Sequence, residues 1–205
     1  MSDRRELVLP LSILRRSDVA CVGGKNASLG EMIGSLEEAG INVPGGFATT
    51  AAAYWHFIES NNLQPRIAQT IATLDKELGN LVNVGRSIRD LFLEAQLPSD
   101  LKKAIYQAYR DMSADGAGSV AVRSSATAED LPEASFAGQH ATFLNVETDE
   151  ALLDAVRRCV RSLDTARAAA YRADRRAAPG EEGQAAMAVV VQRMVPAESA
   201  GVVFT

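Results

Sequence analysis

The sequence predicts an α+β fold, in which helices and strands occupy separate stretches of the chain. Three apolar stripes between residues 65 and 112 repeat at three- and four-residue spacing, which is typical of helices. Two strand-like segments frame a polar loop over residues 120–146. A nearly continuous apolar run over residues 187–195, MAVVVQRMV, predicts a central buried strand. With 205 residues, of which 47% are hydrophobic, the chain can bury one core or two small lobes.

The composition excludes several classes of function. The formal net charge is -5, whereas nucleic-acid binding usually needs a basic footprint, so we expect no nucleic-acid partner. No window approaches the roughly 18 apolar residues of a membrane span, and no apolar stretch of signal length follows the first residues. We therefore expect a cytoplasmic protein without membrane contact. Cys21 and Cys159 have no CxxC or histidine companion and are predicted to be reduced thiols.

Two glycines and a lysine precede the first predicted helix. A short apolar segment over residues 7–14 predicts a first strand, and the apolar residues that follow Gly23, Gly24 and Lys25 recur at helical spacing until Gly40 closes the helix. Unpaired N–H groups and the macrodipole of a helix N-terminus attract anions, which makes Lys25 a candidate phosphate ligand. The alternative is a solvated lysine, because GGK is not the GxxxxGK[ST] pattern.

Residues 43–47, VPGGF, predict a turn, after which Thr49 or Thr50 can cap a second helix. That helix carries an aromatic and apolar cluster made of Tyr54, Trp55, Phe57 and Ile58. Such a cluster could stack on a nucleotide base, but large aromatic side chains more often fill a core, and we assign it to the core. The helices over residues 65–112 likewise supply scaffold rather than chemistry.

The hairpin over residues 120–146 carries candidate ligands for an anion. Its first strand delivers Arg123, whose planar guanidinium suits phosphate oxygens. Small and hydroxyl residues crowd the rest of this region: Ser124, Ser125, Thr127, Ser135 and Gly138. Small side chains let backbone N–H groups approach a ligand, so we hypothesise that the hairpin covers the phosphates of a nucleotide. The alternative is a solvated hairpin whose hydroxyls cap local turns.

Asp149 is predicted to cap the helix after the hairpin. The residues expected to face inward are Leu152, Leu153, Val156, Val160 and Leu163. Seven arginines occur between residues 157 and 176, with aspartates interleaved. A run of this kind is usually a solvated helix face, although one or two of these arginines could gather phosphate.

Gln192 is the polar exception in the strand predicted over residues 187–195. A buried amide must find partners, and an adenine edge offers both donors and acceptors. The alternative is that neighbouring backbone satisfies the amide. Residues 201–205 start another strand-like run, and an unpaired strand is a poor natural terminus, so we expect the chain to be a piece of a longer protein.

Four motifs resemble, in order and spacing, the start of the phosphoenolpyruvate synthases. They are GGKNASLGEM at 23–32, PGGFATTAAAY at 44–54, AVRSSATAEDLPEASFAGQ at 121–139 and VVVQRMV at 189–195. These motifs are also similar to the nucleotide domains of pyruvate phosphate dikinase and rifampin phosphotransferase. The resemblance implies an ATP-grasp-like nucleotide-binding domain, of which residues 1–205 form the amino-terminal part. This part would be the first lobe with a helical insertion, and the domain would be incomplete.

The resemblance assigns seven residues to a nucleotide site. They are Lys25, Arg123, Gly138, Thr142, Gln192, Met194 and Val195. The two cations would neutralise phosphate charge, the glycine and the threonine would shape the loop over the phosphates, and the last three would hold the base. We expect the Mg²⁺ ligands beyond residue 205. We expect no catalytic residue within the chain, because neither His56 nor His140 lies in a motif that supports phosphotransfer.

The implied activity is that of a phosphoenolpyruvate synthase, also called pyruvate, water dikinase. Such enzymes move the β-phosphoryl group of ATP to a histidine on a separate domain and then to pyruvate. ATP and Mg²⁺ are the expected cofactors, pyruvate would bind through other domains, a homodimer is an open option, and the chain alone is expected to be inactive. One alternative is a rifampin phosphotransferase-like antibiotic kinase, which shares this domain. Another is a catalytically inactive nucleotide-binding or interaction module.

Overall fold

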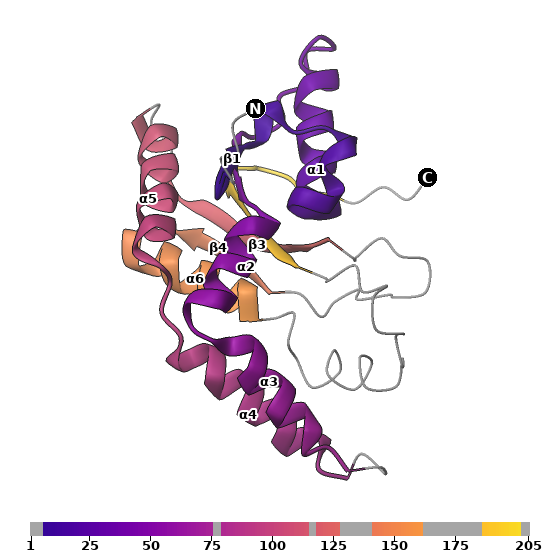
Figure 1. Ribbon diagram of the computed structural model, residues 1–205. Coiled ribbons are helices and arrows are strands. Elements are labelled where there is room, and N and C mark those ends of the chain that lie inside the picture. The colour runs from indigo at the N-terminus through magenta and orange to yellow at the C-terminus, as the bar shows by residue number, and fades with distance from the viewer. Residues whose placement is uncertain (1–5, 76–78, 115–117, 128–140, 162–185, 202–205) are drawn as a thin grey trace.

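The computed structural model describes residues 6–75, 79–114, 118–127, 141–161 and 186–201 (Figure 1). Within these residues a five-stranded antiparallel sheet carries helices on both faces, which confirms the predicted α+β class. Helix α1 (Val19–Leu36) covers one face. Helices α2 (Ala51–Ser60), α5 (Ser99–Ala114) and α6 (Asp149–Arg161) cover the other.

The sheet has the strand order β1-β2-β5-β3-β4. Its strands are β1 (Val8–Pro10), β2 (Gly46–Thr49), β3 (Val120–Ala126), β4 (Thr142–Val146) and β5 (Met187–Arg193). β5 lies at the centre, and its first five residues are buried, as the apolar run predicts. It ends at Arg193 rather than at the predicted Val195. Arg193 N–H still donates to Gly45 O, but β2 begins only at Gly46, so the ladder between β2 and β5 does not extend beyond Arg193.

Strand β2 corrects the predicted turn over residues 43–47. The turn ends earlier, because Gly46 and Phe47 already pair with Gln192 and Val191 of β5. A Cβ at Gly46 would collide with Val191 O, so glycine lets the two backbones pair closely at this point. Gly46 therefore belongs to the sheet, although the composition of residues 43–47 predicts a turn.

The amino-terminal segment forms a shorter strand than the sequence predicts. β1 covers three residues, and the 3₁₀ helices η1 (Leu11–Ile13) and η2 (Arg16–Asp18) take up the rest of the segment before α1 begins. The predicted closure of α1 at Gly40 is confirmed. Gly40 has a φ of 74°, and Ile41 N–H donates back to Leu36 O at 3.0 Å, which is a left-handed helix end.

The aromatic cluster belongs to the core, as predicted. Tyr54, Phe57 and Ile58 of α2 are buried against the sheet, and Trp55 packs at their edge. Thr50, one of the two predicted caps, accepts a hydrogen bond from Ala53 N–H at 3.2 Å. The hydroxyl of the other candidate, Thr49, instead accepts from Val189 N–H of β5.

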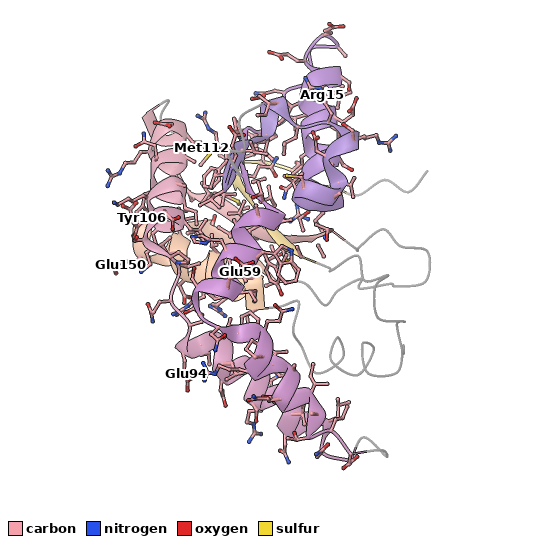
Figure 2. The ribbon with its side chains drawn as sticks, in the orientation of Figure 1. Arg15, Glu59, Glu94, Tyr106, Met112 and Glu150 are labelled. Carbon is pink, nitrogen blue, oxygen red and sulfur yellow. The ribbon has the colours of Figure 1, made fainter. Side chains whose placement is uncertain are left out.

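The predicted helices of residues 65–112 are confirmed as α3 (Leu63–Ala72), α4 (Leu81–Glu94) and α5. α3 and α4 pack side by side and project away from the sheet, whereas α5 packs against β1 and β2 (Figure 1). Figure 2 shows acidic side chains such as Glu94 and Glu150 at the periphery, and Met112 at the end of α5 next to the sheet. Helices α3 and α4 serve as scaffold and carry no residue of the predicted nucleotide site.

Helix α6 begins as predicted, but its cap is a different residue. Thr148 Oγ1 accepts a hydrogen bond from Ala151 N–H at 3.2 Å, so Thr148 rather than Asp149 is the N-cap. Asp149 lies in the first turn, where its charge suits the helix macrodipole, and pairs loosely with Arg110 at 3.9 Å. Leu152, Val156 and Val160 are buried, as predicted, and Leu163 lies outside the described residues.

Candidate functional site

The face of the sheet under α1 collects most of the predicted ligands. On β3, Ser125 contacts α1, so Arg123, two residues earlier, points to the same face. Residues directly opposite in neighbouring strands share a face. Thr142 of β4 is the register partner of Arg123, and Gln192 of β5 is that of Ala121. The structure therefore brings Arg123, Thr142 and Gln192 to the face on which α1 and its Lys25 lie.

Helix α1 is kinked within the GGK motif. Gly23 has φ 78° and ψ 162°, a conformation open almost only to glycine, and the second helical stretch begins at Gly24. A Cβ at Gly23 would collide with the carbonyl and hydroxyl oxygens of Ser125. The sequence predicts that two glycines and a lysine precede the first helix, but α1 already begins at Val19. The kink at Gly23 instead starts a second helical stretch, which contains Gly24 and Lys25.

The hydroxyl of Ser125 fills the gap that the kink opens in the helical hydrogen bonds. In a regular helix Asn26 N–H would donate to Val22 O, four residues earlier. Here Ser125 Oγ accepts from Asn26 N–H at 3.4 Å and donates to Val22 O at 3.1 Å. Asn26 Nδ2 also donates to Val22 O, at 2.7 Å. Because all three residues are buried, β3 and the first turn after the kink are joined away from water.

Asn26 has an unusual environment for a buried side chain. Among the described residues its Oδ1 is the one buried side-chain oxygen or nitrogen without a hydrogen-bond partner. Buried polar atoms are normally satisfied, so this open acceptor, in the turn that carries Lys25, is an exception. Asn26 carries no functional signal in the sequence, because an asparagine near a helix start ordinarily serves only as a cap.

The two predicted cations differ in their surroundings. Both Lys25 and Arg123 are partly buried. Within the described part of the structure the Arg123 guanidinium makes no hydrogen bond or ion pair, whereas Lys25 does interact with another group. A half-buried guanidinium that protein groups leave unpaired is well suited to an anionic ligand.

The three candidates for contact with the base have different surroundings. Gln192 Nε2 donates to Pro44 O at 2.9 Å, so neighbouring backbone takes up one of its donors, as the alternative interpretation predicts. Met194 N–H donates to Ser119 O at 3.0 Å, and Val195 is 55% exposed. Gly138 and His140 lie outside the described residues. A role of these residues in holding a base stays a prediction.

The arginines of α6 lie on the opposite face from Lys25. Asp154 pairs with Arg157 at 3.2 Å and with Arg158 at 3.7 Å, as expected of a solvated helix face. Arg158 also stacks 4.4 Å from the ring centroid of Phe143, which follows Thr142 and points away from α1. Burial, followed by the charges of nearby arginines, lowers the pKa of the Arg161 guanidinium. The arginines after residue 161 lie outside the described residues.

His56 has a structural role. Its Nε2 lies 2.9 Å from Asp100 Oδ1, which links α2 to α5, and this hydrogen bond lowers the pKa of the Asp100 carboxyl. In the described ranges no group of three or more histidine, cysteine, aspartate or glutamate side chains could hold a metal ion. None of the helices in these ranges is both long and apolar enough to cross a membrane.

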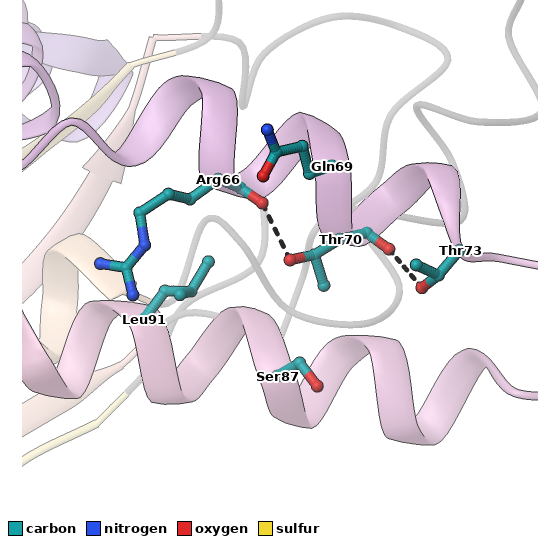
Figure 3. A pocket seen from close by; sticks show the side chains of 6 residues that line it. All are labelled: Arg66, Gln69, Thr70, Thr73, Ser87 and Leu91. Atoms are coloured by element: carbon teal, nitrogen blue, oxygen red, sulfur yellow. Dashed lines mark hydrogen bonds between the residues drawn. The ribbon is translucent and has the colours of Figure 1, made fainter.

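Two hollows lie away from the α1 face. A cavity of about 640 Å³ between α5 and strands β1 and β2 is lined by Phe47, Ala108 and Met112, on the face opposite α1. Figure 3 shows a polar groove between α3 and α4. Its Thr70 and Thr73 hydroxyls donate to carbonyls of their own helix, at 2.8 and 2.7 Å, and so are already satisfied. Neither hollow contains a predicted nucleotide ligand.

The two cysteines are expected to react at very different rates. Cys21 is exposed, whereas Cys159 is buried and donates to Ala141 O, and burial raises its pKa to about 12. Thiolate is the reactive form, so at pH 8 iodoacetamide should modify Cys21 and leave Cys159 intact until the protein is unfolded. Mass spectrometry with and without urea measures this. Equal labelling of both thiols in the folded protein would contradict the buried position of Cys159.

The chain is similar in sequence to known proteins over nearly its whole length. The family model described as "Pyruvate phosphate dikinase, AMP/ATP-binding domain" matches residues 19–205. The chain is 47% identical over 203 residues to the phosphoenolpyruvate synthase of Deinococcus radiodurans, covering 98% of this chain and 25% of that protein. It is 48% identical over 198 residues to that of Neisseria meningitidis (94% and 25%) and 43% identical over 203 residues to that of Escherichia coli (97% and 25%). The chain thus spans about a quarter of the length of these relatives.

Proposed function

This chain belongs to the pyruvate phosphate dikinase AMP/ATP-binding domain family, and we propose that it binds ATP as the amino-terminal part of a phosphoenolpyruvate synthase. The observation that carries the proposal is that Lys25, Arg123, Thr142 and Gln192 share the α1 face of the sheet. Residues 1–205 would form the first lobe of an ATP-grasp-like domain with a helical insertion, and the remaining domains of the protein would supply the other functions.

The residues of the α1 face fit the triphosphate of ATP. The kink places a new helix start at Gly24, where N–H groups and the macrodipole favour negative charge. Lys25 and Arg123 would neutralise the phosphate oxygens, and Thr142, opposite Arg123, would line the same edge with Gly138. Gln192, Met194 and Val195 would border the base. These positions explain how an acidic chain can attract an anion locally.

The chain would act by binding and charge neutralisation. Phosphoryl transfer needs positioned cations around the phosphates and little covalent chemistry from the protein. Mg²⁺ would add positive charge at the phosphate oxygens, through ligands that we propose in sequence beyond residue 205. The histidine that accepts the β-phosphoryl group and the binding of pyruvate belong, in this proposal, to other domains. A cytoplasmic location and a homodimer are compatible proposals for the whole protein.

The activity proposal is tested with the full-length protein. Incubation with ATP, Mg²⁺ and pyruvate should yield phosphoenolpyruvate, AMP and phosphate, and rifampin in place of pyruvate should not be phosphorylated. Phosphorylated rifampin would instead favour the antibiotic kinase. Failure to consume ATP with either acceptor would favour the inactive module.

The isolated 205-residue chain is expected to bind Mg-ATP weakly and without turnover, because one lobe covers only part of a nucleotide. Calorimetric titration of the chain measures the affinity, and chromatography of the nucleotide measures turnover. The same titration of K25A should show further loss of affinity, whereas K103A, which removes an exposed lysine on the other side of the sheet, should match the unmodified chain. Equal affinity of K25A and K103A would exclude Lys25 from the site.

A further inference from the structure

The link between β3 and α1 is made of directional bonds at the place where the helix is interrupted. The apolar contacts beneath α1, of Val22 and Ala27 with Val190, favour burial but do not fix how the helix is rotated or shifted. The hydrogen bonds of Ser125 to Val22 O and from Asn26 N–H are directional and buried. They therefore hold the turn after the kink in one orientation against β3.

This link connects the two elements that carry the predicted cations. Ser125 lies two residues after Arg123 on β3, and Asn26 follows Lys25 on α1. A shift of the turn along the strand would move Lys25 relative to Arg123, although neither residue would change. Binding of a polyanion depends on the positions of the protein cations that contact it. The hydroxyl of Ser125 therefore controls the site without contacting the ligand.

We propose that Ser125 is a positioning residue for nucleotide phosphates. Its hydroxyl replaces the helical hydrogen bond lost at Gly23 and so sets the position of Lys25 relative to Arg123. This inference rests on the proposed ATP-binding function. It assigns Ser125 a role distinct from that of the other hydroxyls of the hairpin.

The neighbouring serine provides a matched control. Ser124 is as deeply buried as Ser125, at 1% against 0% exposure, but it points to the opposite face of the sheet. Its hydroxyl donates to Ala141 O at 3.3 Å and does not touch α1. S124A and S125A each remove one buried hydroxyl from one strand, with the loss, among the described residues, of one hydrogen bond for Ser124 and two for Ser125, so both variants should lose stability.

The experiment measures steady-state kinetics and melting temperature of S125A and S124A in the full-length protein. We expect both variants to melt at lower temperature and only S125A to raise the KM for ATP, by roughly tenfold. Deuterium uptake of the peptide around residues 19–32 should also increase in S125A and not in S124A. A merely structural role would lower the melting temperature and could raise exchange of this peptide, but it would leave the KM of S125A equal to that of S124A.

The failure of this inference can be told apart from that of the proposed function. Equal KM values for S125A and S124A in a protein that uses ATP would overturn the role of Ser125 and leave the function intact. An unmodified protein that does not bind ATP would overturn both. If S125A does not fold, S125C keeps a weaker donor and acceptor in place, and its KM is compared with that of S124C under the same criterion.

Discussion

Replacing Arg123 with alanine in the full-length protein is expected to lower kcat by on the order of a hundredfold or more, the usual effect of losing one cation that stabilises transition-state charge. Arg123 is partly buried on the α1 face and, within the described residues, makes no hydrogen bond or ion pair. Its removal therefore leaves no group among the described residues unpaired, and the loss should appear in the rate rather than in stability. Initial-rate measurements with saturating ATP and pyruvate give the change in kcat.

Arg193 is the matched control for Arg123. It is also a partly buried arginine of the sheet, but it follows Gln192 on β5 and points to the opposite face, where its guanidinium donates to Met112 O at 2.7 Å. R193A should lower the melting temperature, because Met112 O loses that partner, and should keep kcat close to that of the unmodified protein. If R123A were as active as R193A, Arg123 would have no place at the phosphates.

Replacing Gly23 with alanine is expected to destabilise the 205-residue chain by about 2–6 kcal/mol, from backbone strain at a positive φ together with overpacking. The added Cβ would meet Ser125 O, a backbone atom that cannot move without shifting β3. At about 2–4 °C per kcal/mol for a domain of this size, the melting temperature should fall clearly in differential scanning calorimetry. The same variant should weaken ATP binding, because the turn that carries Lys25 must move.

Gly40 provides a comparison at a positive φ without the contact to Ser125. Its φ is 74°, and a Cβ at Gly40 would meet no atom within 4 Å, whereas Gly23 combines that contact with φ 78° and ψ 162°, a conformation more restricted to glycine. G40A should therefore cost only the backbone strain, about 1–2 kcal/mol, and leave ATP binding unchanged. If G23A and G40A destabilised the chain equally, the contact between Gly23 and Ser125 would not constrain the kink.

Much of the fold could be predicted because its signals are local. The apolar stripes of α3, α4 and α5, the buried run of β5 and the glycine that ends α1 depend on spacing along the chain alone. The same holds for the aromatic cluster of α2, whose size favours the core. Periodicity does not mark where an element stops. The predicted end of β5 at Val195 therefore lies beyond the observed end, and β1 is shorter than the apolar segment that predicts it.

The errors fall where contacts distant in sequence decide the local structure. Gly46 reads as part of a turn, but pairing with Gln192 makes it a strand residue. Thr148 and Asp149 are both good caps by composition, and the backbone path at the start of α6 selects Thr148. Asn26 gives no sequence signal, because its environment is created by Ser125, 99 residues away.

By itself the sequence determined the fold class, the family resemblance and the identity of the candidate cations Lys25 and Arg123, since all three depend on residue types and their spacing. The tertiary structure decided that Arg123, Thr142 and Gln192 share the α1 face, and that a serine hydroxyl bridges the interrupted helix. The physical reason is that register and close packing arise between segments far apart in the chain. A hydrogen bond across such a distance depends on where folding places both partners, which neither segment specifies alone.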